Sequence, residues 1–201
     1  MAILYVETNL LVAIATGRDD RALPLIQSPP PRFRIAIPGI CFLEALDWME
    51  DEVKRHNVFI NDINRNLSEL RRDLTSTHAD RLFAHLTAAK IEKDAILRDI
   101  DDRLSGAEVE LSLRGEILNL TGGTVVASRQ TVLIRQLTDN LILHTILDHA
   151  RADHEPIKAF LTENHRDFGA TEAQAALKSA GIALFSTSEQ FLEWASSSDD
   201  D

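Results

Sequence analysis

The sequence predicts an α/β protein with three α/β/α layers and a central, mostly parallel sheet of about four to five strands. Two observations carry this prediction. Short apolar runs are continuous rather than alternating, which is typical of strands buried on both faces of a parallel sheet. Helical patterns separate these runs, which favours βα units over a β-sandwich. A third observation, a long stretch with almost no strand signal, predicts a helical hairpin inserted into the core.

Four runs are predicted to be strands, and each is followed by residues typical of a turn or a helix start. They lie at residues 3–6, 34–37, 157–161 and 182–185. The continuous Ile, Leu, Val and Phe content of these runs gives no exposed face, so the strands are expected in the interior of the sheet.

The helical hairpin is predicted to span residues 47–119, with a polar break at 75–78 between its two helices. Apolar residues recur at helical spacing on both sides of the break. We expect them to form the contact between the two helices: Ile63, Leu67, Leu70 and Leu74 on the first, and Leu82, Leu86, Ala89, Ile96, Ile100 and Leu104 on the second. Arg65 and Arg72 are seven residues apart on one face, which predicts either a solvated face or an RNA-binding ridge.

The last third of the chain is predicted to return to the α/β pattern. A turn is expected at Gly122–Gly123, a short extended piece at 124–126, and helices at 139–151, 171–180 and 189–195. Gly181 is expected to be a left-handed cap. Residues 1–195 are therefore predicted to form a single domain that includes the insertion, followed by a disordered acidic tail at 196–201.

The composition excludes some classes of function. A formal net charge of -11 argues against a protein that coats nucleic acid through a broad basic surface, but it allows an enzyme that meets nucleic acid at one local patch. The apolar N-terminal stretch has no preceding basic residue and is interrupted by Glu7 and Asn9, so neither a signal peptide nor a membrane helix is expected. The single cysteine, Cys41, predicts a reducing, cytoplasmic setting.

Four carboxylates are expected to meet at one end of the sheet. Ligands in open parallel sheets bind beyond the carboxyl ends of the strands, and Glu7, Glu44 and Asp167 all follow a predicted strand, while Asp139 opens the helix before the third strand. The runs around Glu7, Glu44 and Asp139 are apolar and contain no Lys or Arg. Carboxylates crowded in such a setting repel one another and have raised pKa values. A divalent cation relieves this, and hard oxygen ligands suit Mg²⁺ or Mn²⁺.

These same segments resemble the PIN-domain family. The resemblance rests on ILYVETNLLVA, RIAIPGICFLEAL, LTDNLILHTIL and AFLTENHRDF, and it covers roughly residues 1–46 and 125–195. It implies a metal-dependent nuclease, mostly acting on RNA, with catalytic and metal-binding acids at Glu7, Glu44, Asp139 and Asp167. Asn164 is implied as a further metal ligand. Residues expected to orient the site or contact phosphate are Thr8, Asn9, Thr162, Arg129, Arg135 and Arg166.

The sequence also departs from the family pattern. Glu7 stands where the family has Asp, and Asn164 stands where an Asp often occurs. Three hypotheses therefore remain. The first is a Mg²⁺- or Mn²⁺-dependent ribonuclease acting on single-stranded RNA. As the toxin of a toxin–antitoxin pair, it would bind an antitoxin protein, and a homodimer is its expected oligomeric state. The second is a catalytically degenerate scaffold that binds RNA or a protein partner. The third is a phosphatase-like hydrolase of small phosphoesters.

Overall fold

The computed structural model describes residues 1–197, and its core is a five-stranded sheet in which every pairing is parallel. The strands are β1 (Ala2–Val6), β2 (Phe33–Pro38), β3 (Glu116–Leu118), β4 (Ile157–Leu161) and β5 (Ile182–Phe185). Their order across the sheet is β3-β2-β1-β4-β5. The predicted α/β class with a parallel sheet is therefore confirmed. The predicted tail at 196–201 overlaps the end of the last helix at Ser196 and Ser197, and its remainder lies outside the described residues.

The four predicted strands are all present, and their apolar runs explain why. All five residues of β1 are buried, because strands and helices cover them on every side. The fifth strand, β3, falls within the range predicted to be helical. It has only three residues, it lies at the edge of the sheet, and Glu116 and Ile117 are exposed. A strand this short and this exposed leaves no apolar run in the sequence.

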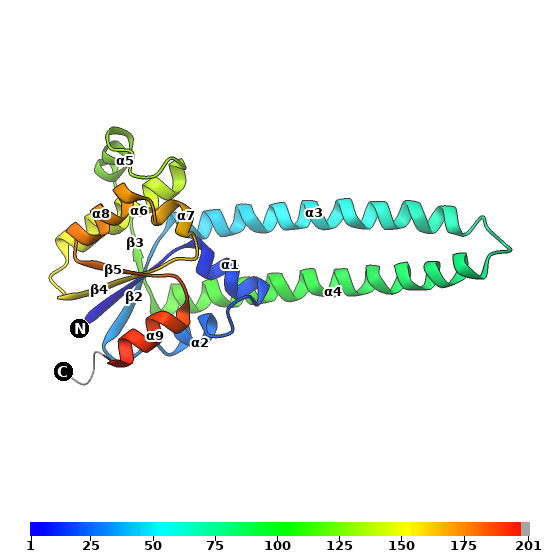
Figure 1. Ribbon diagram of the computed structural model, residues 1–201, viewed down its shortest axis with the longest axis horizontal. Helices are drawn as coiled ribbons and strands as arrows, with labels where there is room; N and C mark the ends of the chain where they lie inside the picture. The colour runs from blue at the N-terminus through cyan, green and yellow to red at the C-terminus, as the bar shows by residue number, and fades with distance from the viewer. Residues whose placement is uncertain (198–201) are drawn as a thin grey trace.

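Helices cover both faces of the sheet (Figure 1). They are α1 (Thr8–Thr16), α2 (Ala22–Gln27), α3 (Ile40–Leu70), α4 (Thr77–Arg114), α5 (Gly122–Gln130), α6 (Leu137–Ala152), α7 (His165–Phe168), α8 (Thr171–Ser179) and α9 (Ser188–Ser197). Helices α6 and α8 lie on one face, and α1, α2, α9 and the C-terminal half of α4 lie on the other. None of the helices in residues 1–197 combines the length and the hydrophobicity needed to cross a membrane.

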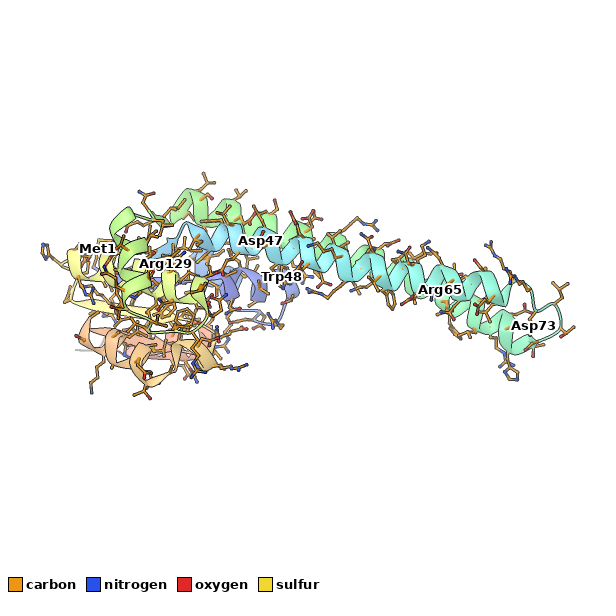
Figure 2. All side chains as sticks on the ribbon, turned by 90° about the horizontal axis from the view of Figure 1, so that it is seen from above. Met1, Asp47, Trp48, Arg65, Asp73 and Arg129 are labelled. Atoms are coloured by element: carbon orange, nitrogen blue, oxygen red, sulfur yellow. The ribbon has the colours of Figure 1, made fainter. Side chains whose placement is uncertain are left out.

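Helices α3 and α4 form a two-helix arm that projects from the α/β body (Figures 1 and 2). They have 31 and 38 residues, so the predicted hairpin is confirmed, although α3 already begins at Ile40. Polar pairs join the helices within the arm. Glu52 pairs with Lys93 at 3.5 Å, and His56 Nε2 lies 2.9 Å from Asp94 Oδ1. The contact between the helices is therefore only partly hydrophobic.

The residues predicted to line this contact are only partly correct. Ile63, Ile100 and Leu104 are buried, but the predicted positions Leu74, Leu82, Ala89 and Ile96 are exposed, Leu74 to 91%. The less exposed positions of α4 repeat every three and four residues and include Ala79, Phe83, Leu86, Lys90, Lys93 and Leu97. This is the spacing of two helices packed side by side. Because Lys90 and Lys93 occupy the contact, hydrophobicity alone selected positions one residue away from it.

Two further predictions on local structure have different outcomes. The predicted turn and extended piece at 122–126 are wrong, because these residues begin helix α5. The Thr121 side chain accepts a hydrogen bond from Thr124 N at 3.1 Å and so caps the helix, which lets Gly122 and Gly123 form its first turn. Gly181 does adopt a left-handed conformation, with φ of 71°, directly after α8 and its C-cap residue.

The strand order creates a natural binding crevice. The chain moves from β1 outward to β2 and β3, and then returns past β1 to form β4 and β5. The direction of winding therefore reverses between β1 and β4, and open α/β sheets bind ligands at the carboxyl ends of strands on either side of such a reversal.

Candidate functional site

The carboxyl ends of β1, β2 and β4 bring the predicted acids toward one another. Glu7 follows β1 and is the N-cap of α1, and Glu44 lies in the second turn of α3. Asp139 lies in the first turn of α6, and Asp167 lies in the short helix α7, whose N-cap is Asn164. Each acid thus stands at the start of a helix that follows or precedes a strand. We refer to Glu7, Glu44, Asp139 and Asp167 as the acid site.

Glu7 is the most buried member of the acid site. Its side chain is only 1% exposed. Oε2 accepts a hydrogen bond from Asn9 N at 2.8 Å, and Oε1 accepts one from Thr162 Oγ1 at 2.8 Å. These bonds lower the pKa, but burial outweighs them. The pKa of Glu7 is therefore raised from 4.5 to about 7, and the nearby Asp139 adds to the rise.

Glu44 is held by two hydroxyl groups. Thr8 Oγ1 donates to Glu44 Oε2 at 2.5 Å, which joins the first residue of α1 to α3. The Thr138 side chain also bonds to Glu44. Desolvation raises the pKa of Glu44 in spite of both bonds. The predicted orienting roles of Thr8, Asn9 and Thr162 therefore correspond to observed contacts with acid-site carboxylates.

Asp139 and Asp167 share one amide group. Asn164 Nδ2 donates to Asp139 Oδ2 and to Asp167 Oδ2, both at 3.0 Å. The two carboxylates therefore lie within reach of one nitrogen atom. Burial, followed by the charges of Glu44 and Asp167, raises the pKa of Asp139 to about 6. The amide of Asn164 thus stands between two carboxylates that repel each other.

In residues 1–197, no basic side chain compensates the charge of the acid site. Within residues 1–197, none of its four carboxylates forms an ion pair with Lys, Arg or His. The Coulombic influences that act on Glu7 and Asp139 come from other acids and raise their pKa values. Crowded, desolvated carboxylates of this kind attract a divalent cation.

The acid site is not arranged as a closed coordination shell. In the described part of the chain, no three or more His, Cys, Asp or Glu side chains are grouped so that they could hold a metal ion. The donor chemistry fits Mg²⁺ or Mn²⁺, because the site offers hard carboxylate oxygens without a compensating charge. Asn164 presents its amide nitrogen to Asp139 and Asp167, and this nitrogen is not a ligand for a cation.

Two of the three predicted arginines lie close to the acid site. Arg135 and Arg166 line a hollow of about 730 Å³ that Asp167 also lines. The hollow lies between the loop before α6 and the α7–α8 region. Arg129 does not line it, and its side chain is exposed in the last turn of α5 (Figure 2). Arg135 and Arg166 are thus beside the acids, whereas no contact connects Arg129 with them.

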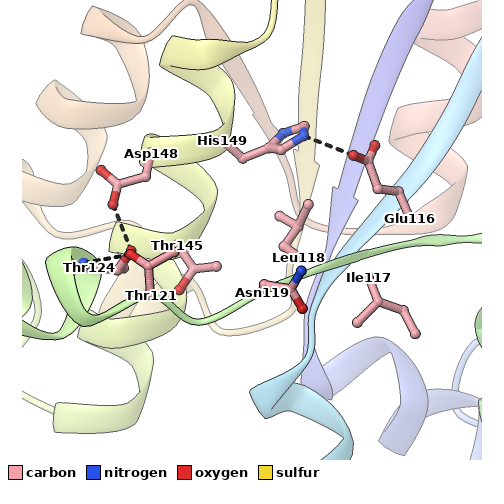
Figure 3. Close-up of a pocket in the computed structure, with 9 residues that line it drawn as sticks. All are labelled: Glu116, Ile117, Leu118, Asn119, Thr121, Thr124, Thr145, Asp148 and His149. Atoms are coloured by element: carbon pink, nitrogen blue, oxygen red, sulfur yellow. Dashed lines mark hydrogen bonds and ion pairs between the residues drawn. The ribbon is translucent and has the colours of Figure 1, made fainter.

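A separate polar hollow of about 320 Å³ lies between β3, α5 and α6 (Figure 3). Its acids have partners, unlike those of the acid site. Asp148 accepts a hydrogen bond from Thr124 Oγ1 at 2.8 Å, and Glu116 contacts both Arg34 and His149. These carboxylates are already satisfied, so this hollow has no comparable need for a cation.

Two side chains of the site were not predicted from the sequence. Thr138 bonds to Glu44, and its position directly before Asp139 is the signal that marks it. Cys41 is fully buried and bonds to Thr8, and its pKa is raised by burial and by the neighbouring Glu7. The thiol therefore lies beneath the acid site as a neutral, packed group.

Comparison with known proteins adds no assignment. No protein-family model matches the chain, no curated protein matches it, and no solved structure matches it. The resemblance to PIN domains, the antitoxin partner and the homodimer therefore stay predictions.

Proposed function

We propose that the protein is a divalent-metal-dependent ribonuclease that hydrolyses RNA phosphodiester bonds at the acid site. The observation that supports the proposal is the charge coupling of acids at the switch point of the sheet, where no Lys, Arg or His of residues 1–197 forms an ion pair with them. Folding such a site costs free energy, because a buried, uncompensated carboxylate is destabilising. A bound Mg²⁺ or Mn²⁺ ion repays that cost.

The acid-site residues divide into distinct roles. Glu7, Glu44, Asp139 and Asp167 are not grouped closely enough to hold an ion as they stand, so they would have to close around the cation. The Asn164 side chain would have to turn its oxygen toward the site to join them. A bound divalent ion would polarise the scissile phosphate and lower the pKa of a water molecule. Thr8 and Thr162 fix the orientations of Glu44 and Glu7 through the hydrogen bonds described above.

The hollow beside Asp167 gives the substrate a place to bind. Arg135 and Arg166 line it from two different segments, and guanidinium groups bind phosphate oxygens through paired hydrogen bonds. They would hold the phosphodiester next to the carboxylates, since Asp167 lines the same hollow.

Asp139→Asn tests this function, because it keeps the side-chain shape and removes one charge. We expect the Mn²⁺-dependent cleavage of single-stranded RNA to fall by about 100-fold or more. The matched control is Asp148→Asn, which alters another acid of the same helix that already bonds to Thr124. Cleavage should be unchanged in the control. Equal cleavage by Asp139→Asn and the unaltered protein would rule out the proposed ribonuclease function.

A specific observation favours a second candidate, a catalytically degenerate scaffold. The Asn164 amide already bridges Asp139 and Asp167, so part of their repulsion is relieved without a cation. Thermal unfolding at increasing Mn²⁺ separates the two candidates, because an ion that binds only the folded state raises the melting temperature. A rise in the unaltered protein that is absent in Asp139→Asn supports the nuclease, and no rise in either supports the scaffold.

A further inference from the structure

The arm carries basic residues with and without acidic partners. Near the body, Lys54 pairs with Asp51 at 2.8 Å and Arg55 pairs with Glu52 at 2.7 Å. We call residues 63–90 the distal arm. Within the described chain, four of its basic side chains form no ion pair with a carboxylate: Arg71, Arg72, Arg81 and Lys90.

The distal arm also differs in net charge from the rest of the chain. The distal arm carries five Lys and Arg residues against three Asp and Glu residues, whereas the whole chain carries 21 against 32. Asp73, one of these three acids, uses its carboxylate within the turn, where it accepts hydrogen bonds from Thr75 and Ser76. The distal arm is therefore a basic region on a strongly acidic protein.

Two of the unpaired cations line a groove between the helices. Arg71 comes from the end of α3 and Lys90 from α4, and the groove has a volume of about 360 Å³. Lys90 Nζ donates to Asn64 Oδ1 at 2.9 Å, which fixes one of its three protons and leaves two for a ligand. The groove thus offers cationic donors from both helices.

An aromatic ring completes the groove. The guanidinium of Arg71 lies over the ring of Phe83, 5.2 Å from the ring centre, and both residues line the groove. A guanidinium plane and an aromatic ring are the surfaces on which single-stranded bases stack, and the cations match the phosphates beside those bases. An acidic peptide would match the charges, but its carboxylates would not stack on the Arg71 guanidinium and the Phe83 ring.

We propose that this distal groove is a second RNA-binding site, which takes the phosphate backbone and one base of a single strand. The proposal rests on the ribonuclease function and deepens it, because it names a single strand long enough to reach from the acid site to the groove. Twenty residues of α3 separate Glu44 from Asn64, which is about 30 Å of helix. About nine stacked nucleotides cover that length.

The test measures RNA binding without metal and therefore without cleavage. The full-length protein is titrated in EDTA against a fluorescently labelled, unstructured single strand of about 20 nucleotides, a length chosen to exceed the estimated span. We expect R71Q/K90Q to weaken binding by about 10-fold, and to lower the slope of log K against log salt by about 1.4 for two lost phosphate contacts. The matched control is K54Q/R55Q, which removes the same charge from the paired residues near the body and should change affinity less than about twofold.

A second variant addresses the stacking surface. Phe83→Leu keeps an apolar side chain in the groove and removes the ring, and we expect it to weaken RNA binding by about fivefold or more. Its melting temperature, followed by circular dichroism, must equal that of the unaltered protein, and Phe83→Tyr, which keeps the ring, should restore binding. Loss of binding in both Phe83 variants would overturn the stacking role.

The outcomes separate this proposal from the ribonuclease function. Undiminished RNA binding by R71Q/K90Q, an equal loss in K54Q/R55Q, or no binding by the unaltered protein overturns the distal groove, whatever Asp139→Asn does to cleavage. If R71Q/K90Q loses binding but neither the unaltered protein nor any variant cleaves RNA, RNA binding at the distal groove is supported and the ribonuclease function is excluded. Polyglutamate that binds as tightly as RNA, with the same dependence on Arg71 and Lys90, overturns the assignment to nucleic acid.

Discussion

The two ends of the molecule both hold like charges without partners, but they do so under opposite physical conditions. The acid site lies in the densely packed body, where burial raises the pKa values of Glu7 and Asp139. The cations of the distal arm lie on a two-helix projection, where solvent screens them and long side chains keep them apart. Desolvated charge costs stability, whereas exposed charge costs little. We therefore expect substitutions of these charged groups to affect stability more in the body than in the distal arm.

The largest expected effect is on the packing beneath the acid site. Phe160 of β4 and Phe168 after Asp167 are fully buried and meet edge to face, with ring centres 5.0 Å apart. Phe160→Ala should lower the free energy of unfolding by about 3–5 kcal/mol, measured by denaturant titration, because it leaves a cavity. A loss below about 1 kcal/mol would mean that the body is no more tightly packed than the arm.

The next effect concerns the bridging amide. Asn164→Asp removes the donor that Asp139 and Asp167 share and adds a charge, so we expect the metal-free protein to lose about 1–3 kcal/mol of stability. Mn²⁺ should restore it, because a carboxylate is the better ligand. Calorimetric titration should show tighter Mn²⁺ binding than in the unaltered protein. Weaker binding would show that the acid site is not a cation site.

The pH dependence of stability sharpens the same comparison. In the unfolded chain Glu7 titrates near 4.5, and in the folded chain near 7, so the folded state binds the proton more tightly. The stability from this group is complete below the lower value and is lost as pH rises through about 7, by roughly 3 kcal/mol. Denaturant titrations of the metal-free protein between about pH 5 and pH 8 should show this fall. Glu7→Gln should reduce this fall in the free energy of unfolding. An unchanged fall in that variant would show that another group causes the pH dependence.

The smallest effect is expected at the tip of the arm. Leu74 is 91% exposed, so Leu74→Ala should change the free energy of unfolding, measured by denaturant titration, by less than about 0.5 kcal/mol. A larger loss would show that a contact buries the tip in solution, and the contrast between a packed body and an exposed arm would then not hold.

The layers of the fold can be predicted because buried parallel strands have continuous apolar sequences. It fails at β3 and at α5 for local reasons. The strand β3 is exposed, and α5 begins on two glycines that depend on the Thr121 cap. The hairpin was predicted, but its internal register was not, because Lys90 and Lys93 replace apolar residues at the contact.

For the acid site, the acidic residues could be selected from the sequence, but their contacts could not. The rule that ligands bind beyond strand ends selected Glu7, Glu44, Asp139 and Asp167. Their charges do act on one another at Glu7 and Asp139, but their role as a site stays a prediction. The bridge made by Asn164 was not predictable, because its amide was expected to act as a ligand rather than as a donor to two acids. The distal groove depends on which residue of α4 faces Arg71, and the spacing of Arg65 and Arg72 on one helix carries no such information.

The continuity of α3 has a mechanical consequence. The helix that carries Glu44 runs on to Leu70 with neither glycine nor proline between them, so it bends little along its length. From Glu44 to Arg71 it measures about 40 Å, and a tilt of about 5° at its base moves its far end by about 3.5 Å. A tilt of this stiff helix at Glu44 would therefore be magnified at its basic end.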